Sequence, residues 1–304
     1  MGTGILSGLF WAMETVLIGQ VMHMEGMSVL FLTPFVCTFL HDAFSAIWMF
    51  AYNHKNGQIQ AVRDSFQSRN GKFVSLAAII GGPVGMSGYM MTIHYLGSSM
   101  GAVVSAIFPA IGALLAVLFL KEKMKWYQWV FLFLTLLGVY GINYSSSIEI
   151  VNVSLGFLGA FLCAFGWGME AVILAKCLKS DQIRHEHALQ IRQTTSALVY
   201  GLVLLPFLMK FNFMALFWNG RVLLLIGVAA LFATVSYLFY YKAIYKVGAS
   251  KAMALNITYV AWSIVLTVVL FQDFNFITPM TLGCSVLVFG CGILTTFDFK
   301  RKIV

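Results

Sequence analysis

Charged residues are scarce in this sequence. Only 10% of its 304 residues are charged, whereas 60% are hydrophobic. A soluble domain of this size has charges on roughly a quarter of its residues. Nineteen basic and eleven acidic side chains cannot coat such a surface, so we expect most of the exterior to face lipid and no soluble domain to be present. The net charge of +8 comes from short basic tracts between apolar runs, which favours lipid headgroups over nucleic acid as the partner.

Cysteine pairs and several enzyme motifs are also missing. The five cysteines lie in or beside apolar runs without CxxC spacing, which is typical of small buried side chains rather than of disulfides or a metal site. There is no GxxxxGK[ST] phosphate loop and no HExxH zinc motif. We therefore expect no cofactor, no metal and no enzyme activity. A polytopic membrane enzyme remains a distant alternative, and it would need clustered acidic or His residues at one membrane face.

Long apolar runs dominate what is present. Lipid offers no water to the backbone, so each run must be helical, and the period-two alternation of a membrane β-barrel is absent. The sequence predicts an all-α integral membrane protein with ten transmembrane helices. They are expected near residues 3–22, 29–52, 72–95, 99–120, 126–144, 155–177, 188–209, 221–244, 249–271 and 277–297.

The basic residues alternate between the two sides that these runs define. Sixteen of the nineteen Lys and Arg residues fall on one side, Lys210 and Arg221 fall on the other, and Arg192 lies inside the seventh run. Positive residues accumulate in cytoplasmic loops. We expect a multi-pass cell membrane protein with both its N- and C-termini in the cytoplasm.

The two halves of the chain resemble each other. Trp11-Ala-Met-Glu14 in the first run corresponds to Trp167-Gly-Met-Glu170 in the sixth, and Gly97 corresponds to Gly248 at an offset of 151. At the same offset, Lys121-Glu122 falls opposite Gln272-Asp273. Five spans per repeat would turn the second repeat upside down, and inverted repeats place a transport site near the midplane. The predicted repeats are residues 1–147 and 148–304, within one membrane domain.

Glu14 and Glu170 are the most informative residues. An ionised carboxylate at the bilayer centre costs roughly 2.5–3.5 kcal/mol, so it needs a cavity, a partner or a function. Glu14 lies about 15 Å into the membrane at the rise of an α-helix. Because the Trp-x-x-Glu spacing puts both side chains on one helix face in both halves, we favour a binding role over a purely structural carboxylate.

Aromatic side chains make up 15% of the sequence, and several accompany these carboxylates. Most aromatics in such a chain pack or form interfacial belts. An aromatic wall beside a carboxylate is nevertheless what a quaternary ammonium needs, since each cation–π contact is worth about 0.5–2 kcal/mol. The predicted substrate-binding residues are Trp11, Glu14, Tyr89, Trp167, Glu170, Tyr237, Tyr259 and Trp262.

Three further charged residues lie inside the predicted membrane region. His41-Asp42 lies in the second run, and Arg192 falls opposite His41 at the offset of 151. An Asp42–Arg192 pair or a His41 proton relay would form a gate. The alternative is a buried structural pair, with Arg192 reaching towards the headgroups.

The third run is interrupted by Gly81-Gly-Pro83-Val-Gly85. Proline removes an internal hydrogen bond of the helix, and glycine loosens the turn. The pattern predicts either a kink that serves packing or a partly unwound stretch whose carbonyls reach a substrate.

Ten spans in two five-helix repeats resemble the drug/metabolite transporter superfamily over nearly the whole chain. A narrower resemblance is carried by Phe39-Leu-His41-Asp42, Gly82-Pro83-Val-Gly85, Trp167-Gly-Met-Glu170 and Ile191-Arg192-Gln193. These motifs are similar to the choline permeases of bacteria that decorate surface glycopolymers with phosphocholine. The resemblance implies uptake of choline with protons by alternating access, and it transfers site positions directly only to Trp167 and Glu170.

The leading hypothesis is a secondary transporter that imports choline together with protons. The alternative from the same superfamily is an exporter of amino acids, drugs or metabolites. The sequence leaves open which carboxylate binds substrate, which binds protons, and what Arg192 does. It also leaves open the direction and stoichiometry of transport, the choice among choline, betaine and other amines, and the oligomeric state.

Overall fold

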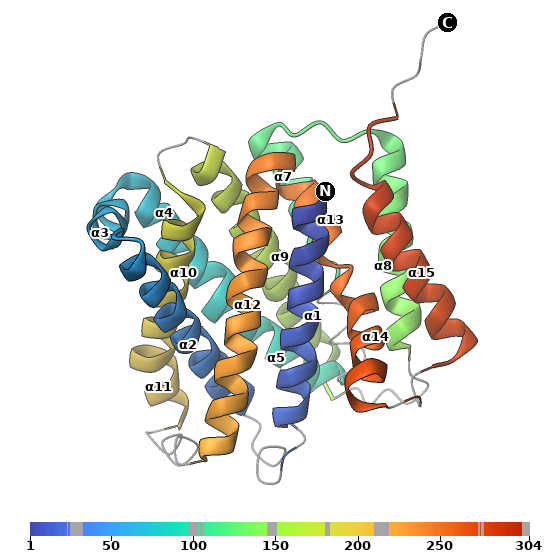
Figure 1. Cartoon of the computed structure of the whole chain (residues 1–304). Coiled ribbons are helices and arrows are strands. Elements are labelled where there is room, and N and C mark those ends of the chain that lie inside the picture. The colour runs from blue at the N-terminus through green and yellow to red at the C-terminus, as the bar shows by residue number, and fades with distance from the viewer. Residues whose placement is uncertain are drawn as a thin grey trace, which may run out of the picture.

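A computed structural model describes residues 1–22, 24, 33–97, 103, 106–144, 151–179, 183–209, 219–272, 274 and 277–299. Within these ranges all regular secondary structure is helical, which confirms the predicted all-α class. The helices form one bundle in which most axes run in broadly the same direction (Figure 1). Met1 and the last described residues after α15 lie at the same end of this bundle (Figure 1).

The helical elements follow the predicted apolar runs. Before residue 144 they are α1 (Gly2–Met22), α2 (Thr33–Lys55), α3 (Ile59–Gln67), α4 (Arg69–Ile79), the π-helical η1 (Ile80–Val84), α5 (Gly85–Leu96), α7 (Phe108–Leu120) and α8 (Trp126–Asn143). After it they are α9 (Val153–Lys179), α10 (His185–Val199), the π-helical η2 (Tyr200–Leu204), α11 (Leu205–Met209), α12 (Gly220–Val247), α13 (Ala249–Asn256), α14 (Tyr259–Phe271) and α15 (Pro279–Leu294).

Seven helical stretches are long and apolar enough to cross a membrane, namely residues 2–21, 34–55, 69–96, 153–179, 185–208, 220–247 and 249–271. Two shorter apolar helices, α7 and α15, occupy two more of the predicted runs, and α8 occupies the remaining one. The run predicted near 99–120 is described as a continuous helix only from Phe108. The chain is therefore a multi-pass membrane protein.

Several helices begin at residues whose side chains satisfy the first free backbone N–H groups. Ser68 accepts a hydrogen bond from the N–H of Gly71 at the start of α4, and Asn219 accepts one from Val222 at the start of α12. At the start of α15, Thr278 precedes Pro279. Proline suits the first turn because that turn does not need its missing N–H.

Corresponding residues of the two halves have matching backbone conformations. Gly97 has φ 85° and ψ 161°, and Gly248, 151 positions later, has φ 91° and ψ 166°. Lys121 ends α7 at φ 55° and ψ 34°, and Gln272 ends α14 at φ 52° and ψ 29°. These two are the positive-φ residues other than glycine in the described chain. Left-handed backbone is uncommon for such side chains, so its recurrence at this offset is informative.

Helices from the two halves pack in an exchanged pattern. The first helix of each half packs on the third and fourth of the other: α1 contacts α12 and α14, whereas α9 contacts α5 and α7. The second helices α2 and α10 pair, and so do the last helices α8 and α15 (Figure 1). Buried hydroxyls reinforce this packing, since Ser236 donates a hydrogen bond to the carbonyl of Ser7 at 2.8 Å.

Helix α9 crosses α5 with almost no space between the two backbones. A Cβ atom at Gly88 would lie 2.5 Å from the carbonyl oxygen of Gly159, and one at Gly159 would lie 2.6 Å from that of Gly88. Only glycine fits at both positions. This crossing fixes α9 in the middle of the bundle, where its inward face reaches the cavity described below.

Glu122 links the end of α7 to the start of α13. Its carboxylate accepts hydrogen bonds from the N–H groups of Ala249 and Ser250 at 2.8 and 3.2 Å, and from the Ser250 hydroxyl at 2.6 Å. Lys179 lies 3.4 Å away on the same carboxylate. A negative charge is stabilised at the N-terminus of a helix, here that of α13. Because α7 and α13 come from different halves, the contact links the two halves at the end of the bundle where Met1 lies.

Candidate functional site

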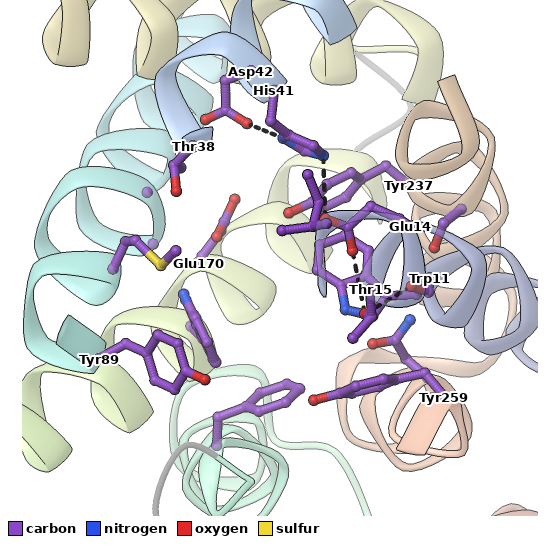
Figure 2. A pocket seen from close by; sticks show the side chains of 18 of the residues that line it. Trp11, Glu14, Thr15, Thr38, His41, Asp42, Tyr89, Glu170, Tyr237 and Tyr259 are labelled. Carbon is purple, nitrogen blue, oxygen red and sulfur yellow. Dashed lines mark hydrogen bonds and ion pairs between the residues drawn. The ribbon is translucent and has the colours of Figure 1, made fainter. Parts of the chain in front are cut away.

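A cavity of about 450 Å³ lies between the two halves of the bundle. Its walls come from α1, α2, η1, α5, α7, α9, α10, α12, α13 and α14. All of the predicted site residues line it except Trp262: Trp11, Glu14, His41, Asp42, Tyr89, Trp167, Glu170, Arg192, Tyr237 and Tyr259. Figure 2 shows the labelled side chains arranged around a shared central space.

Ring faces and edges make up much of the wall. Trp11 meets Tyr237 edge-on at a centroid distance of 5.1 Å. On the opposite wall, Trp167 lies 5.8 Å from Tyr89 and 5.7 Å from Phe108. These are ordinary aromatic packing distances, so the rings support one another while they border the cavity. The result is a concave aromatic surface contributed by both halves of the chain.

Arg192 is buried at the cavity and joins three helices. Its Nε donates to Glu170 Oε1 at 2.8 Å, and its Nη1 lies 3.2 Å from Asp42 Oδ1. The same Nη1 donates to Gln193 Oε1 at 2.6 Å, and the guanidinium carbon lies 4.9 Å from the centre of the Tyr237 ring. The predicted contact between Asp42 and Arg192 is thus present, and the second bond, to Glu170, is one that sequence analysis did not foresee.

Glu14 has no guanidinium partner among the residues that the structure describes. Its Oε2 accepts a hydrogen bond from Thr15 at 3.2 Å, and its Oε1 lies 3.9 Å from His41 Nε2. The other ring nitrogen of His41 lies 2.9 Å from Asp42 Oδ1 (Figure 2). His41 Nε2 has no hydrogen-bond partner among the described residues. A titratable imidazole therefore bridges the gap between Glu14 and the paired carboxylates.

The interrupted third run serves the site by leaving room for it. The stretch around Pro83 is η1, a π-helical turn, which is a known consequence of a disturbed hydrogen-bond ladder and is frequent at functional sites. A Cβ atom at Gly81 would overlap Glu170 Oε2, and one at Gly85 would lie 2.9 Å from the Trp167 ring. The Glu170 and Trp167 side chains of α9 therefore occupy the space that larger residues at these two positions would fill. The missing side chains thus create space for the site.

Trp262 is a correction to the predicted site. It is on α14, one turn beyond Tyr259, but it is not among the residues that line the cavity. Its ring packs edge-on against Phe289 of α15 at 5.4 Å. One turn displaces a side chain by about 5 Å along the helix axis, which is enough to move it from the cavity to the contact between α14 and α15.

Comparison with known proteins identifies the kind of protein that contains this cavity. The model of the EamA-like transporter family matches residues 1–144 and again residues 154–296. The chain belongs to the EamA-like transporter family. The predicted membership in the drug/metabolite transporter superfamily is confirmed. This is a family of transporters, so the cavity belongs to a membrane transporter rather than to an enzyme.

One relative and one solved structure match nearly the whole length of this EamA-like chain. Protein LicB of Haemophilus influenzae is 32% identical over 308 residues, which covers 98% of this chain and 97% of LicB. A solved crystal structure matches with a TM-score of 0.75 over 97% of this chain and 95% of its own length. At 15% identity, the second likeness supports the fold alone.

Other cavity residues of this EamA-like protein were not predicted from its sequence. They include Thr15, Thr38, Met86, Ser236 and Asn256. Asn256 ends α13 and donates to the Ser7 hydroxyl at 2.7 Å. Apart from Met86 these are small polar residues, which are common in membrane helices, so no spacing in the sequence distinguishes those that face the cavity. No cluster of three or more His, Cys, Asp or Glu suited to a metal occurs in the described part of the chain.

Proposed function

We propose that this transporter imports choline, or a closely related quaternary ammonium ion, by alternating access. The observation that carries the proposal is the combination, among the described residues of one cavity, of aromatic walls with three carboxylates and one guanidinium. Aromatic faces attract cations by about 0.5–1 kcal/mol when exposed and by about 2 kcal/mol or more when desolvated. Glu14, which is not bonded to Arg192, supplies the negative field for the bound cation.

The state of the polar groups favours a cation that needs no hydrogen-bond acceptor. A quaternary ammonium has no N–H to donate, so ring faces can surround it without leaving a polar group unpaired. An amino acid would also need a positive partner for its carboxylate. Arg192 is already paired with Glu170 and Asp42, which argues against the alternative of an amino-acid exporter.

We also propose that the chain crosses the membrane ten times, as two inverted repeats of five spans at 1–147 and 148–304. Four observations support this: the matched backbone of Gly97 and Gly248, that of Lys121 and Gln272, the exchanged packing of α1 and α9, and the two separate family matches. A site between inverted repeats can be exposed to either side by rocking one repeat against the other.

The proposed orientation places both termini in the cytoplasm. Sixteen basic residues support it, and Met1 lies at the same end of the bundle as the last described residues. The position of the 145–150 loop lies outside the described residues. A reporter fused after Val304 should be active only on the cytoplasmic side, and an epitope inserted between 145 and 154 should be labelled from outside intact cells. The reverse pattern of labelling would reject this orientation.

Import of a permanent cation has a driving force in a cell that is negative inside. The membrane potential supplies roughly 2.3 kcal/mol per charge per 100 mV, which corresponds to an accumulation of about 50-fold. A proton carried with the substrate adds to this driving force. His41 is the proposed proton site, because its Nε2 lies 3.9 Å from Glu14 Oε1 at the cavity and neither residue is bonded to Arg192.

Counterflow of labelled choline into proteoliposomes tests the proposed function. Liposomes that contain the purified protein and are preloaded with choline should exchange it, and empty liposomes should not. Choline and acetylcholine-like quaternary amines should compete well, ethanolamine poorly, and zwitterionic amino acids hardly at all. Competition by neutral amino acids, with none by quaternary amines, would reject choline import and favour the exporter.

A further inference from the structure

The charged groups that face the cavity can be counted. On α1 there is Glu14, on α2 there are His41 and Asp42, on α9 there is Glu170, and on α10 there is Arg192. The other titratable groups on the lining are uncharged in their protonated forms: Cys37, Tyr89, Tyr237, Tyr240 and Tyr259. Among the described residues that line the cavity, with His41 neutral, three carboxylates and one guanidinium give the empty site a net charge of −2.

Arg192 contributes a permanent positive charge to the site. A guanidinium does not lose its proton in proteins. It is buried, it is paired on two of its nitrogens, and it lies over the Tyr237 ring as a bound cation would. Within the protein it therefore takes one of the places that a positively charged substrate would otherwise fill.

We propose that Arg192 sets the proton stoichiometry of the transporter by cancelling one of the three buried carboxylates. An occupied site that is closed to both sides at the low-dielectric midplane must be close to electrically neutral, because an uncompensated buried charge is costly. A net charge of −2 is neutralised by one monovalent organic cation and one proton. The inference rests on the proposed function, and it specifies one proton for each choline.

The net charge of the site predicts different proton-to-choline ratios for variants that change this charge. Glu170→Gln leaves a net charge of −1, so choline alone neutralises the site, and the expected ratio is zero protons per choline. Arg192→Gln leaves −3, so the expected ratio is two. The double variant Glu170→Gln with Arg192→Gln returns to −2 and should again carry one proton. Arg192→Lys keeps the charge and should also carry one.

The experiment measures the proton-to-choline ratio in proteoliposomes. A pH gradient and a potassium diffusion potential are imposed against a fixed choline gradient, and the voltage at which net choline flux stops gives the ratio. Each variant is first checked for a single symmetric gel-filtration peak and for choline binding. Arg192→Gln alone should lower choline uptake at pH 7.5 at least tenfold, and adding Glu170→Gln should restore uptake to within about threefold of the wild type.

A purely structural role for Arg192 predicts a different outcome. Removing its partner as well would then give no rescue, and the ratio would stay at the wild-type value in every variant that folds. Either result would overturn the proposal. If Arg192→Gln does not fold, Glu170→Gln and Arg192→Lys still decide, since their expected ratios are zero and one. Wild-type protein that fails to move choline would reject the proposed function, and this inference with it. Choline transport with ratios unrelated to the charge count would reject the inference alone.

Discussion

The first helices of the two halves present the same pair of residues to one cavity in different electrostatic surroundings. Trp11 and Glu14 come from α1, and Trp167 and Glu170 come from α9, with the same spacing. Glu170 is held at 2.8 Å by Arg192 of the neighbouring α10. Glu14 faces His41 of the neighbouring α2 at 3.9 Å. One half therefore pairs its carboxylate with a permanent cation, and the other half faces it with a group that can gain and lose a proton.

This difference arises at corresponding positions. His41 and Arg192 are 151 residues apart, the offset that also relates Gly97 to Gly248. Histidine changes its charge within the physiological pH range, whereas arginine does not. The comparison indicates how a nearly symmetric bundle can divide two tasks: the first half exchanges protons, and the second half keeps a fixed charge.

Replacing His41 with Arg would abolish the difference and should have the largest effect. Both halves would then contain a permanent cation, the site would have a net charge of −1, and choline uptake would no longer depend on protons. A single co-transported proton adds tenfold accumulation per pH unit, so an inward gradient of two units should raise wild-type accumulation about 100-fold. In His41→Arg the same gradient should give no increase, as measured with labelled choline at zero membrane potential.

The control for this variant is choline binding at equilibrium, which should persist because the aromatic walls and a net charge of −1 remain. Arg192→Lys serves as a second control, since it changes a cation of the site without changing the charge count. A His41→Arg protein that binds choline and still responds to the pH gradient would show that the division between the halves does not exist.

Replacing each of the two tryptophans also tests the comparison between the halves, and the expected effect is smaller than that of His41→Arg. Among the described residues, Trp167 contacts both Tyr89 and Phe108, whereas Trp11 has one ring partner in the cavity wall, Tyr237. Trp167→Leu should therefore weaken choline binding about 30-fold, which corresponds to the loss of one desolvated cation–π contact of about 2 kcal/mol, and Trp11→Leu about threefold. Isothermal titration of the purified variants measures both effects.

Phe133 provides the matched control for these substitutions. It is on α8, its side chain is 60% exposed on the outer surface of the bundle, and it does not line the cavity. Phe133→Leu should leave choline affinity unchanged. Equal losses for Phe133 and Trp167 would mean that the substitutions act through general destabilisation, and a larger loss for Trp11 than for Trp167 would contradict the proposed order.

The sequence was sufficient to predict features that are local and repeated in both halves. It was insufficient to predict contacts between helices that are far apart in the sequence. The apolar runs and the Trp-x-x-Glu pairs are local features, and both correspond to what the structure contains. The bond between Arg192 and Glu170 depends on how α9 and α10 rotate against each other, which no spacing reveals. Trp262 shows the same limit, since one turn of α14 separates a residue at the cavity from one at a helix contact.

The glycines of the third run illustrate a second limit. The sequence indicated an irregular helix there, but not that Gly81 leaves the space in which Glu170 lies. Packing of this kind involves residues almost 90 positions apart. It becomes visible only when the helices are assembled.

The ion pair between Asp42 and Arg192 also has a consequence for biosynthesis. The two residues are 150 positions apart, and a ribosome adds about 5–20 residues per second, so the guanidinium is made about 8–30 s after the carboxylate it will meet. During that interval α2 enters the bilayer with a charge whose insertion costs roughly 2.5–3.5 kcal/mol. Helix α1 lacks its main packing partner for longer still, because that partner, α12, begins only at Gly220. The early helices of this protein must therefore be kept from misassembly, by the translocon or a membrane chaperone, until the later ones arrive.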